Sequence, residues 1–403
     1  MSHRSLVDVT SPQSPVLSKR RPFVRTPLLL SLPTELLERI IYESCNTGRR
    51  ALRCTCMLLC RFATPFVFET LVIDTETMSL SNSRDRLRFF RALASGKTFT
   101  RYVRYLHLIS LELPEGRCTL VSLDRRRRER NSKKLEELLV AAIPLMTSLR
   151  GVQYDGVERR LRENGVLWDQ IRSLPSISMF SWIGYPVPIT NFPHLTQLSI
   201  RGHLFSRSVA ILISNSPHLS SLSVLSTNFP GYNPSVLAFF RQYPPGKYSS
   251  ITNLSLCGNL AVFQSDVPLL IPHLCQLQSL ELSINFVASE FWASLQAERI
   301  FVRRLSLSLL RDDPMLFDYL CSYSGLDSLF LLIRRGSGEA TQKGMERVRE
   351  RHGEMLQKCE PPGLQFGEYD AEDNSWSWKI SEAVWMRKWG LDQHSRMCGI
   401  CIL

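Results

Sequence analysis

Cysteine and histidine are the residues of this chain whose spacing could support chemistry. Cys398 and Cys401 have the CxxC spacing of zinc and redox sites. A zinc ribbon needs a second such pair, and thioredoxin-like chemistry needs the pair to open a helix after a strand; the sequence offers neither. Cys54, Cys56 and Cys60 fall within an apolar helical pattern. We therefore expect packing thiols there, and neither a metal nor a cofactor.

The tripeptide Pro-His-Leu occurs three times, with its histidine at His194, His218 and His273. Imidazoles repeated at one place in successive units could bind a metal. The first two histidines, however, directly precede a motif that itself recurs along the chain. The phase of that repeat explains the recurrence, so we interpret these histidines as structural.

The short motifs on which many enzyme sites are built are missing. The sequence contains no GxxxxGK[ST], GxSxG, HExxH or GxGxxG string. Phosphate-binding loops, hydrolase nucleophile elbows and zinc-protease helices therefore have no starting point. We predict that the chain is not an enzyme and has no catalytic residues.

The net charge of +12 is concentrated in the sequence. Residues 1–27 carry a balance of +4 and residues 117–134 a balance of +6, so the remainder is nearly neutral. The stretch LDRRRRERNSKK (123–134) could neutralise phosphates, but it has no aromatic residue to stack on bases. We interpret it as a solvated basic loop, ahead of a nuclear import signal and then RNA binding.

Composition limits the class of protein. At 403 residues and 44% hydrophobic content, the chain can form two or three domains with a sizeable core. It has no run of eighteen apolar residues, and its N-terminus lacks the apolar region of a signal peptide. The eleven cysteines have no framework spacing and are expected to be reduced. These features predict a cytoplasmic or nuclear protein without a membrane partner.

Residues 28–67 predict a small helical module that follows a disordered tail, residues 1–27. Pro33 suits the first position of a helix, and Leu32, Leu36 and Ile40 repeat every four residues beside Leu37 and Ile41. Residues 46–48 interrupt this pattern. A second helix follows, with apolar residues at helical spacing until Pro65 ends it: Leu52, Cys56, Leu59, Ala63 and Phe66. Roughly forty residues bury too little surface to be stable alone, so the module must pack on the rest of the chain or on a partner.

From residue 68 to 339, one pattern recurs ten times: an apolar residue, two others, an apolar residue, one other, and a last apolar residue. Its first copy is Phe68-Leu71-Ile73 and its last is Leu326-Leu329-Leu331. The last two apolar residues of each copy would alternate on a short strand and point inward, and helices would cover the outer face. A unit of this kind cannot bury its own core, whereas stacked units can. The pattern therefore predicts an irregular solenoid with one parallel sheet.

The residues between the paired strand apolar positions would then form a line on the other face of the sheet. We consider this line a candidate surface for binding a target protein. Its members are Ser199, Ser223, Ser255, Glu281, Ser306 and Phe330.

Residues 340–403 depart from the repeat. A charged helical stretch leads to an acidic turn, and four of the seven tryptophans follow within a short segment. We expect these residues to form a tryptophan-rich cap that seals the last repeat. The four tryptophans are Trp376, Trp378, Trp385 and Trp389.

The N-terminal module resembles an F-box, the short helical module that docks a Skp-type adaptor. The resemblance rests on Leu32-Pro33, Glu35-Leu36-Leu37 and Ile40-Ile41, followed by Leu52, Cys56, Leu59 and Ala63-Thr64-Pro65. No Trp stands where many F-boxes carry one, and Phe62 is the nearest aromatic residue. The resemblance implies that the adaptor is bound by Leu32, Pro33, Leu36, Leu37, Ile40, Ile41, Leu52, Leu59 and Phe62.

The repeat in turn resembles the L-x-x-L-x-L strand of leucine-rich repeats, including the turn-capping asparagine at Asn259 and Asn285. Together, the two parts resemble the F-box/leucine-rich-repeat family, and most closely its large sets in mushroom-forming fungi. The resemblance implies an α/β fold and a substrate-receptor subunit of a cullin-type SCF ubiquitin ligase, with an unidentified protein target. Two alternatives remain open: a repeat scaffold without a link to ubiquitin, and an RNA-associated repeat protein.

Overall fold

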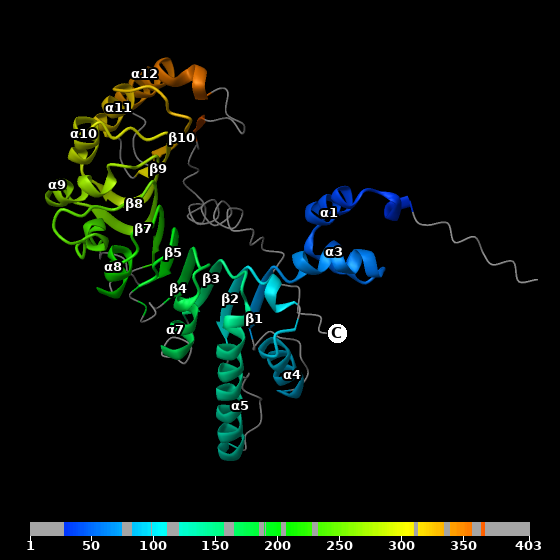
Figure 1. Cartoon of the computed structure of the whole chain (residues 1–403). Helices are drawn as coiled ribbons and strands as arrows, with labels where there is room; N and C mark the ends of the chain where they lie inside the picture. The colour runs from blue at the N-terminus through cyan, green and yellow to red at the C-terminus, as the bar shows by residue number, and fades with distance from the viewer. Residues whose placement is uncertain are drawn as a thin grey trace, which may run out of the picture. The chain divides into compact units, whose positions relative to one another are not determined.

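The computed structural model describes residues 28–74, 83–97, 99–110, 121–156, 165–184, 189, 191–202, 207–227, 233–309, 313–333, 339–356 and 364–366. The chain divides into two compact units, Met1–Ala63 and Thr64–Leu403. It is an α/β protein in which N-terminal helices precede an all-parallel sheet (Figure 1). The predicted tail, the four tryptophans and the Cys398–Cys401 pair lie outside the described residues.

The N-terminal helices differ in number from the two that were predicted. They are η1 (Leu28–Ser31), α1 (Thr34–Glu43), α2 (Asn46–Arg53) and α3 (Met57–Val67). The predicted interruption at residues 46–48 is wrong, because Cys45 caps α2 there: its Sγ accepts a hydrogen bond from the Gly48 N–H at 3.4 Å. Nor does Pro65 end α3. The Phe68 N–H still donates to the Thr64 carbonyl at 3.1 Å, so the proline costs the last turn one donor only.

In the second unit, the described strands form one sheet in sequence order, and every pair in it is parallel. The last two apolar residues of all ten predicted copies lie in β1–β10, which is consistent with a solenoid like that of leucine-rich repeats. An eleventh strand comes from the segment that was assigned to the cap. The strands are β1 (Thr70–Asp74), β2 (Tyr105–Ser110), β3 (Gly151–Gly156), β4 (Met179–Gly184), β5 (Gln197–Gly202), β6 (Ser221–Ser226), β7 (Asn253–Val262), β8 (Ser279–Val287), β9 (Arg304–Leu309), β10 (Ser328–Ile333) and β11 (Leu364–Phe366).

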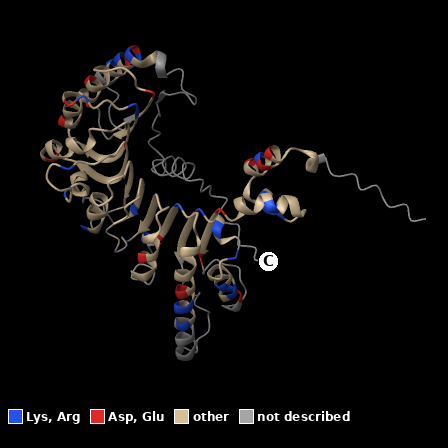
Figure 2. Cartoon of the chain, in the orientation of Figure 1, with Lys and Arg blue, Asp and Glu red and all other residues tan. Residues whose placement is uncertain are grey.

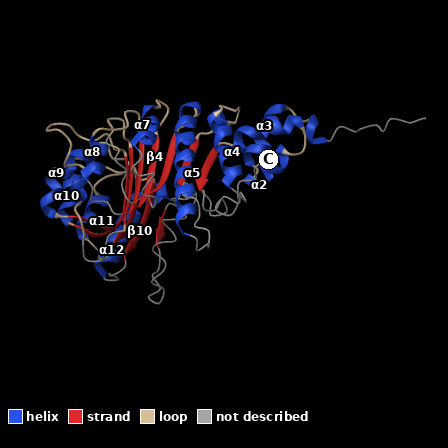
Figure 3. Cartoon of the chain, turned by 90° about the horizontal axis from the view of Figure 1, so that it is seen from below, coloured by secondary structure: helices blue, strands red, loops and turns tan. Residues whose placement is uncertain are grey.

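Helices between the strands cover one face of this sheet (Figures 1 and 3). The α-helices are α4 (Ser83–Ala94), α5 (Val121–Ala142), α7 (Gly165–Ser173), α8 (Arg207–Ser214), α9 (Val267–Leu270), α10 (Ser289–Ala297), α11 (Pro314–Cys321) and α12 (Glu339–Leu356). Short 3₁₀ helices are η2 (Thr100–Tyr102), η3 (Ile143–Leu145), η4 (Val236–Phe239), η5 (Gln264–Asp266) and η6 (Ile271–Leu274). None of the helices in the described part of the chain has the length and apolar character that crossing a bilayer requires.

The basic segment 123–134 is not a loop, as its composition had suggested. It lies within α5, because arginine and lysine favour helix and the segment runs directly into the packed stripe of Leu135, Leu139 and Ala142, all buried.

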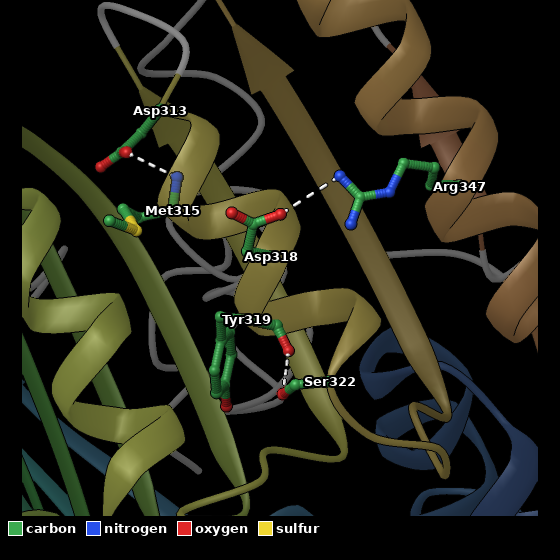
Figure 4. Close-up of polar contacts among 6 residues, drawn as sticks. All are labelled: Asp313, Met315, Asp318, Tyr319, Ser322 and Arg347. Atoms are coloured by element: carbon green, nitrogen blue, oxygen red, sulfur yellow. Dashed lines mark hydrogen bonds and ion pairs between the residues drawn. The ribbon is translucent and has the colours of Figure 1, made fainter.

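Two of the outer helices begin with a side-chain cap. Asp313 caps α11, with its Oδ1 accepting from the Met315 N–H at 3.0 Å (Figure 4). Asp318 of α11 also forms an ion pair with Arg347 of α12 at 3.1 Å. The short η4 is capped by Ser235, whose Oγ accepts from the Leu237 N–H at 3.0 Å.

The core consists of the inward-facing residues of the strands and the inner stripes of the helices. The predicted strand leucines all lie within it and are at most 3% exposed: Leu198, Leu222, Leu254, Leu280, Leu305 and Leu329. Each aliphatic side chain buried in this way stabilises the fold by about 1.5–3 kcal/mol. At the strand ends the backbones of successive repeats approach closely. Gly202 has a φ of 138°, and a Cβ there would lie 2.4 Å from the Gly184 carbonyl oxygen.

One of the three Pro-His-Leu histidines is part of this packing. His273 is buried; it stacks on Phe240 and packs against the tilted ring of Tyr243, with ring centroids 5.0 and 4.9 Å away, whereas His194 and His218 are exposed. Among the described residues, nothing hydrogen-bonds to its Nδ1, and burial lowers the pKa of His273 below 6.5. The folded protein therefore favours the neutral form of the His273 ring over the protonated form.

This burial predicts an acid-sensitive fold. Because the folded pKa of His273 lies below its unfolded value of about 6.5, the unfolded chain binds the extra proton first. The stabilisation from neutral His273 is complete above that pH and is lost as the pH falls. We expect thermal melts to show a smaller loss of Tm between about pH 7.5 and pH 5 in His273→Phe than in wild type. The exposed His194→Gln serves as the control. An equal loss in all three proteins would show that His273 does not contribute.

Candidate interaction surfaces

The first candidate surface lies on α1, in the N-terminal unit. Leu36 and Ile40 stand one helical turn apart and are 47% and 39% exposed. We call this pair the α1 stripe. Met57 and Leu58 at the start of α3 are also exposed, at 88% and 39%. Exposed aliphatic side chains at this density on a small helical unit are typical of a surface that binds a partner.

The other predicted adaptor residues divide between surface and interior. Leu37, Ile41 and Leu59 are buried, at 1%, 0% and 4% exposure. Leu32, Leu52 and Phe62 are partly buried, and Pro33 is exposed. The apolar residues of α1, which the sequence suggested would act as one surface, therefore form two: Leu37 and Ile41 pack inward, and the α1 stripe faces solvent.

Arg49 of α2 fastens the C-terminal end of α1, and nothing in the sequence pattern had singled it out. Its Nε donates to the Ile41 carbonyl at 3.1 Å and its Nη2 to the Tyr42 carbonyl at 2.5 Å. These carbonyls belong to the last turn of α1, where the helix dipole favours a cation; the Ile41 carbonyl also accepts from the Ser44 N–H at 3.2 Å. The contact fixes α2 against the helix that carries the α1 stripe.

The second candidate surface lies on the sheet, on the face opposite the helices. The register aligns Ser181, Ser199, Ser223, Ser255, Glu281, Ser306 and Phe330 across seven successive strands. We call this line the serine row. It contains all six predicted residues and extends the line by Ser181. The last five members, from Ser223 onward, are partly exposed.

Two members of the serine row are less accessible than the alternation of side chains suggested. Ser181 and Ser199 are both only 2% exposed. Ser199 lies on one face of β5 with the longer side chains of Gln197 and Arg201, two positions to either side. A short side chain between two long ones is shielded even on an outward face.

The chemistry of the serine row is that of recognition by hydrogen bonds. Ser255 donates to the Glu281 carboxylate at 2.7 Å. Cys257, two residues further along β7, is 8% exposed, and burial together with the nearby Glu281 charge raises its pKa to about 12. The thiol therefore remains protonated and a poor nucleophile at neutral pH.

A further polar pair on this face lies far apart in the sequence. His107 on β2 and Asp155 on β3 place Nε2 and Oδ1 3.3 Å apart. Within the described part of the chain, no group of three histidine, cysteine or acidic side chains could hold a metal ion. Residues 107 and 155 come together only through the stacking of repeats, so no local motif could have identified them.

Comparison with known proteins adds no identification. Neither the models of known protein families nor the curated proteins contain a match to this chain.

The register of the serine row can be tested by cysteine labelling. We expect thiols in Ser223→Cys and Ser255→Cys to react rapidly with iodoacetamide in the folded protein. Those in Leu222→Cys and Leu254→Cys should react slowly, because positions 222 and 254 are 1% and 3% exposed. Peptide mass spectrometry separates each site from the native cysteines. Buried Cys257 is an internal control for slow labelling, and exposed Cys275 for rapid labelling. Similar rates at the two pairs of positions would show that the register is wrong.

Proposed function

We propose that this protein is a substrate receptor of a cullin-type ubiquitin ligase, built as an F-box followed by a leucine-rich-repeat solenoid. In this role the N-terminal helices bind a Skp-type adaptor and the repeats bind a protein target. The chain itself breaks no bond, because catalysis belongs to other subunits of the ligase. The proposal places the protein in the cytoplasm or nucleus, where such ligases act.

The α1 stripe is the observation that carries this proposal. Leu36 and Ile40 occupy positions at which the sequence resembles an F-box, and both side chains are exposed. Because less than half of each side chain is exposed, burying the remainder of both against a partner would contribute about 1.5–3 kcal/mol in total, before the cost of association. Pro33 at the beginning of α1 and Met57 and Leu58 on α3 add exposed contacts of the same unit.

Leu37, Ile41 and Leu59 have a different role in this proposal. Since they are buried, they hold the helical unit together and do not touch the adaptor. Arg49 also stabilises the helical unit, because it fixes the C-terminal end of α1. The adaptor surface is thus smaller than the F-box resemblance alone implied.

The serine row supports the other half of the proposal. Its partly exposed members offer hydroxyl groups, one carboxylate and one aromatic ring along a line that crosses successive repeats. Polar groups at fixed spacing on a rigid sheet suit the recognition of a protein segment, since each unmatched polar group would penalise a wrong partner.

Co-purification with a Skp-type adaptor tests the proposal. We expect wild type to retain the adaptor and Leu36→Asp/Ile40→Asp to lose it by at least about 100-fold, because two charges would face an apolar partner. The matched control is Val166→Asp/Leu269→Asp, which alters two apolar side chains elsewhere that are 61% and 62% exposed. Circular dichroism should show that all three proteins are folded.

Two results would contradict the proposal. One is a wild-type protein that fails to retain the adaptor under conditions in which an established F-box protein does. The other is equal retention by wild type and the double variant. Either would favour a repeat scaffold without a link to ubiquitin.

A further inference from the structure

Two neighbouring helices of the second unit, α4 and α5, together carry half of the net positive charge of the chain, since each balances to +3. Residues 1–27 and 117–134 hold balances of +4 and +6. Residues 83–104, however, hold a balance of +6, which acidic residues elsewhere conceal in the total. The α4 helix within this stretch packs directly against α5, whose residues 121–134 hold a balance of +5, reduced to +3 over the whole helix by Glu136 and Glu137. Figure 2 shows Lys and Arg on both helices, which lie side by side in Figures 1 and 3.

The basic side chains lie on the outer stripes of these helices. On α4, Phe90 and Leu93 are buried, and Arg88 and Arg91 are exposed. On α5, the residues packed inward are Ser132, Leu135 and Leu139. Those exposed at its described positions from 130 to 134 are Arg130, Lys133 and Lys134. We call Arg88, Arg91, Arg130, Lys133 and Lys134 the basic ridge.

The ridge is a dense array of cations. Arg88 and Arg91 lie about 4.5 Å apart along α4, and Arg130 and Lys134 about 6 Å apart along α5, at 1.5 Å per residue. The helices α4 and α5 pack against each other, and packed helices are about 8–10 Å apart, so their exposed cations lie on adjacent ridges of the second unit. Asp85 forms an ion pair with Arg88 at 3.5 Å, and the Arg88 side chain is still 77% exposed. The α5 backbone continues through positions 125–128, four further arginines, whose side chains lie outside the described residues.

The surroundings of the ridge restrict the class of partner. None of the exposed large apolar residues in the described part of the chain belongs to α4 or α5. A protein interface normally has an apolar core, and single-stranded RNA is normally held by exposed aromatic rings. A helix that inserts into a membrane needs a free apolar face, whereas the apolar faces of α4 and α5 are packed in the core. A partner recognised by charge alone fits best.

From this pattern we infer that the basic ridge binds the phosphate backbone of double-stranded nucleic acid, without reading its sequence. A duplex carries about one negative charge per 1.7 Å of its axis, a density that matches closely spaced cations. Arginine also pairs with phosphate through two parallel hydrogen bonds. This surface is distinct from the α1 stripe and the serine row, so it does not depend on the proposed ligase function.

Fluorescence anisotropy with a labelled, mixed-sequence DNA duplex tests the inference on the full-length chain. We expect wild type to bind at about 50 mM salt, with log affinity falling against log salt by about 0.9 for each phosphate contacted. In Arg88→Ser/Arg91→Ser/Lys133→Ser/Lys134→Ser, the slope should decrease by about 3–4 and affinity at low salt by at least tenfold. The Tm should stay nearly unchanged, because exposed charges contribute little to stability.

A second variant removes the same charge elsewhere. It replaces four exposed basic residues of other repeats with serine: Arg207, Arg241, Lys247 and Arg303. If this control keeps the wild-type slope, the ridge is the binding surface. Equal losses in the two variants would overturn the inference, because net charge alone would explain them. It would also be overturned if wild type did not bind the duplex, or if it preferred single-stranded RNA, poly-glutamate or phosphatidylserine vesicles.

Discussion

In a parallel sheet, the backbone N–H and C=O groups along the edge of one strand have no hydrogen-bond partner until the strand of the next repeat pairs with them. The rest of this structure depends on how these groups are paired. The carbonyl of Ser178 accepts from two successive N–H groups of the next repeat, those of Thr196 and Gln197, at 2.9 and 3.0 Å. The Thr196 carbonyl does the same for Ser220 and Ser221. Because a buried, unpaired backbone group costs about as much as a lost hydrogen bond, this arrangement fixes each repeat in one register.

That register determines which side chains lie on each face of the sheet. A shift by one residue would exchange the leucines of the core for the serines of the other face, at a cost of about 1.5–3 kcal/mol for each leucine exposed. The serine row is therefore placed by the core and not by its own contacts. The partly exposed side chains of the row, from Ser223 onward, can therefore vary in chemistry without loss of the fold, which is the property that a recognition surface requires. The hydroxyl groups of Thr196, Ser220 and Thr252 strengthen the same register, since each donates to the preceding carbonyl of the ladder.

The sequence predicted the parts of the fold that depend on periodicity. The ten strands, their parallel order and their buried leucines follow from the spacing of apolar residues, which the core requires. The sequence was less informative where a local hydrogen bond or a helix propensity outweighed the structure that the composition suggested. Cys45 begins a helix at a place where Asn46 and Gly48 suggested a break, because its sulfur accepts a backbone hydrogen bond. The arginines of α5 suggested a loop by their charge, although their helix propensity is high.

The features that the sequence did not predict depend on residues that are close in space but distant in the chain. The division of α1 into a buried pair and an exposed pair depends on which side its neighbours occupy, and apolar periodicity alone does not contain that information. The meeting of α4 and α5 has the same origin. Residues 83–104 and 121–134 balance to +6 and +5, and the charge of the whole chain is +12. A total of this size says little until the stacking of repeats brings the two basic helices together, because electrostatic attraction for a polyanion depends on charges within about 8–10 Å of one another. In a solenoid, the charge of each helix is therefore more informative than the total, and here α4 and α5 together carry half of the net charge.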